Sequence, residues 1–221
     1  MPALYLLPLI CVAVLFLILA EFRHNRKQIY FIKPLSTLLV ILMAIFSFLQ
    51  PNHNITFSII VLIGLLFCLG GDVALMFQEN QKAFRSGLVL FLMGHVAYIF
   101  AFSLSSTITT LDIFTTLLLL SIGIGFYQLI KANLGKMRIS VILYMVIISL
   151  MVNRAIAVGT NQSIANTQSV MIIVGAILFY VSDIILAANR FWKPWRCNRI
   201  SLAFYYAGQM LIALSASYYI F

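Results

Sequence analysis

The stretch GLLFCLGGDVALMF, residues 64–77, is apolar apart from one carboxylate, Asp72. A second stretch, GAILFYVSDIILAANRF at residues 175–191, carries Asp183 in similar surroundings. Both belong to apolar runs near the ~20 residues that cross a bilayer as a helix. A charged residue at the bilayer centre costs roughly 2.5–3.5 kcal/mol even on the insertion scale, so it normally faces partners or water. We therefore expect the two aspartates to share one functional site.

The composition of the whole chain is that of an integral membrane protein. Of its 221 residues, 63% are hydrophobic and only 9% are charged, and the mean hydropathy is +1.09, which excludes a soluble globular domain. The apolar runs are continuous, unlike the short alternating segments of a β-barrel, and predict an all-α polytopic bundle in one domain, residues 1–221. The eight expected transmembrane helices are residues 4–22, 33–50, 57–77, 86–104, 111–130, 138–153, 168–189 and 200–220.

The basic residues predict the orientation of this bundle. All 14 lysines and arginines except Arg154 lie between an odd-numbered helix and the next even-numbered one. Because Lys and Arg are retained on the cytoplasmic side, these junctions should be cytoplasmic and both termini non-cytoplasmic. We interpret Arg154 as either an interfacial anchor or the partner of a buried polar group. The pattern fits a multi-pass protein of a bacterial inner membrane, and a eukaryotic endomembrane protein would show it too.

The same charges exclude other classes of partner. Topology and attraction to anionic lipid account for the net charge of +9, so we expect membrane lipid and no nucleic acid as a partner. The three cysteines are scattered and His95 is the single histidine in an expected helix, so the ligands of a metal site are missing. We expect no metal and no cofactor, and the sequence assigns no oligomeric state.

Four further polar residues are candidates for binding a substrate. Lys33 precedes Pro34 and is expected to open the helix of residues 33–50 at the interface, a suitable place for a phosphate; the alternative is an ordinary interfacial lysine. His95 and Tyr98 lie one turn apart on one helix face, and Gln209 enters its own helix to a similar depth. These three either line one cavity with the aspartates or only hydrogen-bond the helices together.

The two aspartate helices also resemble each other. Gly64 and Gly175 each precede their aspartate by eight residues, and Gly94-His95 resembles Gly208-Gln209 in the following helices. This pattern favours a parallel 4+4 duplication, although two similar helices with small residues for close packing would also produce it. The aspartates are expected five and six residues before the cytoplasmic ends of their helices, roughly 8 Å below the interface.

A pair of desolvated carboxyl groups has a definite chemical use. Sharing a site favours one protonated and one ionised member, a general acid beside a general base. Such a pair suits hydrolysis of an acid-labile bond, but it also suits activation of water on a peptide or proton transfer in a transporter.

Six stretches together resemble the YhhN-like lysoplasmalogenases over nearly the whole chain. They are KPLSTLL (33–39), GLLFCLGGDVALMF (64–77), FRSGLVLFLMGHVAY (84–98), YMVIISLMVNRA (144–155), GAILFYVSDIILAANRF (175–191) and FYYAGQMLIA (204–213). The resemblance implies an eight-helix membrane hydrolase acting on ether bonds. Its implied substrate is a lysophospholipid, lysoplasmalogen, whose vinyl ether is cleaved to a fatty aldehyde and glycerophosphoethanolamine or glycerophosphocholine. Asp72 and Asp183 would then be catalytic, and Lys33, His95, Tyr98 and Gln209 would bind substrate.

Two other functions use the same aspartates. An intramembrane aspartyl protease would carry a GxGD motif, but Leu69 stands where the first glycine of Leu69-Gly70-Gly71-Asp72 should be. A proton-coupled transporter or channel would use Asp72 and Asp183 as a relay. A purely structural role leaves two costly carboxylates unexplained.

Overall fold

The computed structural model describes residues 2–51, 53–77, 79–194 and 199–218. These residues contain eight helices that are long and apolar enough to cross a membrane, and no β-strand. The all-α polytopic fold is therefore confirmed, and the chain is an integral multi-pass membrane protein. The helices are α1 (Leu7–Phe22), α2 (Arg26–Ile45), α3 (Ile55–Leu75), α4 (Gln81–Leu104), α5 (Thr110–Ile130), α6 (Arg138–Val158), α7 (Asn166–Phe191) and α8 (Ile200–Ser215). Short 3₁₀ segments add η1 (Pro2–Leu6), η2 (Phe46–Leu49), η3 (Lys131–Asn133), η4 (Gly135–Met137) and η5 (Ala216–Tyr218).

Helix α2 begins earlier than its hydropathy suggests. Asn25 caps it, its Oδ1 accepting from the Gln28 backbone N–H at 3.3 Å, so the helix starts at Arg26 with a polar first turn. The prediction that Lys33 opens this helix is therefore wrong: Lys33 and Pro34 lie two turns inside it. The apolar run marks only the part of α2 that lies in the hydrocarbon, so the polar first two turns of the helix were not predicted.

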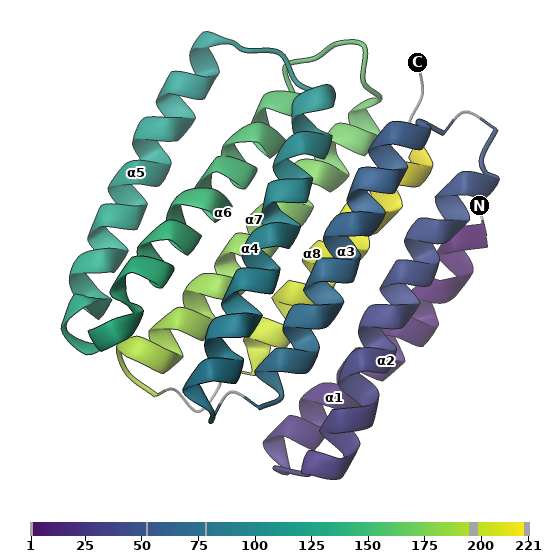
Figure 1. Ribbon diagram of the computed structural model, residues 1–221. Coiled ribbons are helices and arrows are strands. Elements are labelled where there is room, and N and C mark those ends of the chain that lie inside the picture. The colour runs from purple at the N-terminus through teal and green to yellow at the C-terminus, as the bar shows by residue number, and fades with distance from the viewer. Residues whose placement is uncertain (1, 52, 78, 195–198, 219–221) are drawn as a thin grey trace.

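The connections alternate between the two ends of the bundle (Figure 1). The junctions α1–α2, α3–α4, α5–α6 and α7–α8 lie at one end, here called the basic end, while η1 and η5 lie at the other. This arrangement matches the alternation that the basic residues predict, and the cytoplasmic orientation of the basic end stays a prediction. Within the α7–α8 junction, Arg196 and Cys197 lie outside the described residues.

Glycines bring two helix pairs into backbone contact. A Cβ added at Gly94 of α4 would lie 3.1 Å from the carbonyl oxygen of Gly64 in α3, and one at Gly208 of α8 would lie 2.7 Å from that of Gly175 in α7. Small residues allow such close approach in membrane helices. Each aspartate helix, α3 or α7, thus makes the same kind of glycine contact with the helix that follows it. The 4+4 duplication stays a prediction.

Helix α5 lies at one edge of the bundle against α6 (Figure 1). Arg154 of α6 donates to the carboxylate of Asp112 in α5, and the two side chains are 16% and 12% exposed. Asn153 Nδ2 adds a hydrogen bond to Thr115 Oγ1 at 2.6 Å. Of the two interpretations of Arg154, the buried polar partner is the one that the structure shows, and it attaches α5 to the bundle.

Candidate active site

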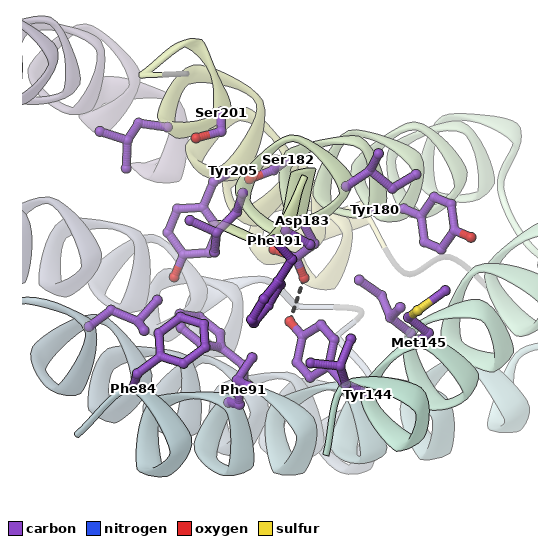
Figure 2. A pocket seen from close by; sticks show the side chains of 18 of the residues that line it. Phe84, Phe91, Tyr144, Met145, Tyr180, Ser182, Asp183, Phe191, Ser201 and Tyr205 are labelled. Carbon is purple, nitrogen blue, oxygen red and sulfur yellow. Dashed lines mark hydrogen bonds between the residues drawn. The ribbon is translucent and has the colours of Figure 1, made fainter. Parts of the chain in front are cut away.

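Asp72 of α3 and Asp183 of α7 line one cavity of ≈ 100 Å³, here called the chamber. Figure 2 shows its aromatic walls, with Asp183 near the hydroxyl of Tyr144 and with Phe84, Phe91 and Tyr205 around them. The expectation that both aspartates reach one site agrees with this geometry. Their distances from the helix ends differ, however, from the five and six residues expected.

Asp72 lies three residues before the end of α3 at Leu75, and Asp183 lies eight residues before the end of α7 at Phe191. Helix α7 continues beyond its apolar run, and its last residue packs against Phe84 of α4 with the ring centroids 6.0 Å apart. The positions of α3 and α7 in the bundle, and not equal spacing from the helix ends, bring the two carboxyl groups together.

The surroundings of Asp72 stabilise an ionised carboxylate. Its Oδ2 accepts hydrogen bonds from Thr37 Oγ1 and from the Tyr205 hydroxyl, both at 2.7 Å. Lys33 Nζ lies 3.4 Å from Oδ1, and the two side chains are only 9% and 2% exposed. A buried carboxylate with three donors, one of them a cation, has its lone pairs satisfied without water.

Asp183 has different partners. The hydroxyl of Tyr144 in α6 donates to its Oδ2, as the dashed line in Figure 2 marks. None of the ion pairs between described side chains involves Asp183. Asp183 is half-buried and lines the chamber. The two aspartates therefore have different partners: Asp72 is paired with a lysine, and Asp183 accepts from a tyrosine hydroxyl.

A chain of hydrogen bonds leads from α4 to Asp72. The Tyr98 hydroxyl donates to Gln209 Oε1 at 2.9 Å, and Gln209 Nε2 donates to the Tyr205 hydroxyl at 3.2 Å. Tyr205 in turn donates to Asp72. Tyr98 and Gln209 are fully buried and do not line the chamber. They stand behind its wall and orient Tyr205, so the geometry does not fit the direct substrate contact expected for them.

His95 also lies behind the wall. It is fully buried, and its ring packs edge-on against Phe179 and Tyr144 at centroid distances of 4.7 and 5.3 Å. Neither ring nitrogen has a hydrogen-bond partner among the described residues, and His95 is not part of the chamber lining. Its contact with Tyr144 makes it a neighbour of the partner of Asp183, and a role in substrate binding stays a prediction.

Lys33 stands at the boundary between two cavities. It lines the chamber and also a polar cavity of ≈ 400 Å³ at the basic end. Its backbone carbonyl accepts from the hydroxyl of Tyr206 at 3.1 Å, which fixes this part of α2 against α8. Binding of a phosphate by Lys33 stays a prediction, and the structure adds its ion pair with Asp72.

Sequence reasoning missed three residues of the site, namely Thr37, Tyr144 and Tyr205. Thr37 follows Lys33 by one helical turn and Tyr205 precedes Gln209 by one turn, and residues four apart share a helix face. That spacing was the signal that would have found them. No comparable spacing points to Tyr144, because none of the candidate site residues lies on its helix, α6.

Fold and site together define a polytopic helical membrane protein with a pair of intramembrane aspartates in one chamber. Residues 28–216 match the model of the YhhN family, and the chain belongs to that family. It is 34% identical over 166 residues to lysoplasmalogenase TMEM86A of Bos taurus, which covers 71% of this chain and 64% of the relative. It is 31% identical over 160 residues to lysoplasmalogenase TMEM86A of Homo sapiens, covering 71% and 64%. It is 30% identical over 187 residues to lysoplasmalogenase TMEM86B of Rattus norvegicus, covering 83% and 70%.

The chain thus spans about 64% of the length of the TMEM86A relatives. No solved structure matches it.

Proposed function

We propose that this protein is a lysoplasmalogenase, a membrane hydrolase that cleaves the vinyl ether bond of a lysophospholipid to a fatty aldehyde and a glycerophosphodiester. The observation that carries the proposal is the chamber, in which Asp72 and Asp183 have different partners inside an otherwise apolar wall. The names of the TMEM86A and TMEM86B relatives support the same reaction. The chamber would lie in the cytoplasmic half of the membrane, which we take to be a bacterial inner membrane.

The chemistry of a vinyl ether matches an acid–base pair without a nucleophile. Protonation of the β-carbon converts the vinyl ether into an oxocarbenium ion. Water then adds to the cationic carbon and loses a proton, which gives a hemiacetal. The hemiacetal collapses to the aldehyde and the glycerol hydroxyl. One group must therefore donate a proton and another must stabilise the cation and accept a proton from water.

The partners of the two aspartates suggest their roles. Asp183 lines the chamber and, among the described residues, accepts a hydrogen bond from the neutral phenol of Tyr144, so it is the group that we assign as proton donor. Asp72 is surrounded by the donors Lys33, Thr37 and Tyr205, and we assign it as the carboxylate that stabilises the oxocarbenium ion and orients water. Fixed charges in a dry site act on a developing cation more strongly than they do in water.

The cavities follow the order of the parts of a lysolipid. The polar cavity lies at the basic end, the chamber adjoins it, and a third, apolar cavity of ≈ 370 Å³ lies between α5 and α6. Met145 lines both the chamber and this third cavity. We propose that the headgroup occupies the polar end, the vinyl ether reaches the aspartates, and the single hydrocarbon chain passes Met145.

The experiment that tests this function is aldehyde release by purified protein in detergent. The substrates are a vinyl ether lysolipid and matched acyl and saturated alkyl ether lysolipids. We expect aldehyde from the vinyl ether alone, with no ion gradient present. Product from none of the three would contradict the hydrolase. It would favour the alternative, a proton-coupled transporter, which moves its substrate only across sealed vesicles.

A further inference from the structure

The polar cavity at the basic end, here called the vestibule, has a volume of ≈ 400 Å³. It shares Lys33, Leu75, Leu186, Ser201 and Leu202 with the chamber, so the two adjoin. Charged side chains reach it from α1, α2, the α3–α4 junction and the start of α8. These are Glu21, Arg26, Lys33, Glu79 and Arg199.

Two ion pairs lie in the vestibule. Arg26 Nη2 is 2.5 Å from Glu79 Oε1, and their side chains are 67% and 76% exposed. Arg199 Nη1 is 3.1 Å from Glu21 Oε2, and these side chains are 27% and 15% exposed. The Arg26–Glu79 pair is solvent-exposed and therefore weakly held, so an incoming charged group can replace one of its partners at small cost.

We propose that the vestibule binds a zwitterionic phosphodiester headgroup, its phosphate held by Arg26 and Arg199 and its cationic end by Glu21 and Glu79. This inference rests on the proposed function, since it treats the ligand as the headgroup of the lysolipid. The inference goes beyond the proposed function because it assigns the residues that recognise each end of that headgroup.

The balance of charges supports a zwitterion over an anion. The charges of the two arginines and the two glutamates of the vestibule cancel, and Lys33 is engaged by Asp72. When a zwitterion binds, its phosphate takes the place of the glutamates beside the arginines, and its cationic group takes the place of the arginines beside the glutamates. All four side chains therefore stay paired. A phosphate monoester would bind the arginines and leave two carboxylates without a cation, which disfavours it. The guanidinium groups also suit phosphate, because they donate to two oxygens at once.

The position of the vestibule fits the reaction. Lys33 is part of both linings, so a headgroup in the vestibule places the glycerol next to Lys33 and directs the ether toward the aspartates. Arg26 and Arg199, and not Lys33, then bind the phosphate.

The test is equilibrium binding to the purified full-length chain in detergent, with ligands that it cannot cleave. One ligand is a saturated alkyl ether lysolipid with a phosphocholine headgroup, and the second is the same lipid with a phosphate monoester. We expect about tenfold tighter binding of the zwitterion, because like charges opposed in a site select against the anion. In Glu21→Gln/Glu79→Gln the preference should fall to about twofold or less. Soluble glycerophosphocholine, as a competitor, distinguishes the free headgroup from the lipid as the occupant.

Two variants control this experiment. Lys82→Gln removes an exposed charge at the same end, outside the vestibule lining, and should keep the preference. Glu79→Gln alone changes a side chain that is 76% exposed, so it tests the assignment if the double variant does not fold, and it should lower the preference at least threefold. Equal binding of both lipids by the unmodified chain, or an unchanged preference in Glu79→Gln and the double variant, would overturn the assignment. This experiment measures binding and not turnover. A protein that releases no aldehyde but still prefers the zwitterion would contradict the proposed reaction and leave the headgroup assignment intact.

Discussion

Lys33 of α2 and Asp72 of α3 form an ion pair inside the bundle, with Lys33 Nζ 3.4 Å from Asp72 Oδ1. Their side chains are 9% and 2% exposed, so each charge depends on the other and on the hydroxyls of Thr37 and Tyr205. A pair of this kind contributes little net stability compared with apolar residues, but losing one partner leaves a buried charge. The pair therefore fixes the position of Asp72 more than it stabilises the fold.

Lys33→Met should destabilise the protein by about 3 kcal/mol, because it leaves the Asp72 carboxylate buried without its cation. Adding Asp72→Asn removes the second charge and should restore most of that stability, while aldehyde release stays absent. Thermal unfolding in detergent measures the first effect and the aldehyde assay the second. If the stability losses of the two single variants simply add in the double variant, the two groups do not act as a pair.

Asp183→Asn should lower kcat by about 10²–10⁴, because an amide cannot supply the proton and general acid catalysis contributes a factor of that size. The variant should stay folded, since the Tyr144 hydroxyl can donate to the new amide oxygen. Asp72→Asn should likewise abolish turnover. Aldehyde release by folded protein, checked by gel filtration, is the measurement. Retained activity in either variant would remove that aspartate from the mechanism.

Tyr205→Phe and Tyr206→Phe form a matched pair on adjacent residues of α8. The Tyr205 hydroxyl donates directly to Asp72, whereas that of Tyr206 donates to the Lys33 carbonyl at 3.1 Å and lies 3.2 Å from Thr37 Oγ1. A hydrogen bond to a charged group contributes about 1.5–3 kcal/mol, so Tyr205→Phe should lower kcat by roughly 10- to 100-fold. Tyr206→Phe should cost about 1 kcal/mol of stability and leave kcat within about threefold. Equal kinetic losses would contradict the assignment of Tyr205.

Met145→Trp should shorten the hydrocarbon chain that the enzyme accepts. Met145 lines both the chamber and the cavity between α5 and α6, and a larger ring there would narrow the passage between them. The measurement is kcat/KM for a series of vinyl ether lysolipids of increasing chain length. Leu143→Trp, at an exposed position of the same helix outside both linings, is the control. The same length profile in both variants would exclude this route for the chain.

Gly208→Ala should destabilise the bundle, because the new Cβ would lie 2.7 Å from the Gly175 carbonyl oxygen and 3.0 Å from the Phe179 backbone nitrogen. Backbone atoms cannot move aside as a flexible side chain can, so α7 and α8 must separate. Gly125→Ala in α5 is the control, with nothing within 4 Å of its added Cβ, and should stabilise α5 by up to about 1 kcal/mol. Thermal unfolding in detergent compares the two, and a neutral Gly208→Ala would argue against the close contact.

Much of this protein was predictable from local sequence. The apolar runs placed all eight helices, because transfer of a side chain into hydrocarbon depends mainly on that side chain. Asp72 and Asp183 were recognisable for the same reason, since a carboxylate in an apolar run is costly wherever it occurs. Helix ends were harder to predict. The side chain of Asn25 caps α2 beyond its apolar run, and hydropathy does not detect such a side-chain-to-backbone hydrogen bond.

Only the tertiary structure decided how the helices are rotated toward one another, and that rotation determines the partners of each aspartate. It places Lys33, Thr37 and Tyr205 on Asp72 and leaves Asp183 with Tyr144. It also places Tyr98, Gln209 and His95 behind the chamber wall, where sequence reasoning had expected them to touch substrate. The physical reason is that hydrophobicity acts residue by residue, whereas a hydrogen bond or ion pair between helices requires two side chains distant in sequence to meet within about 3 Å.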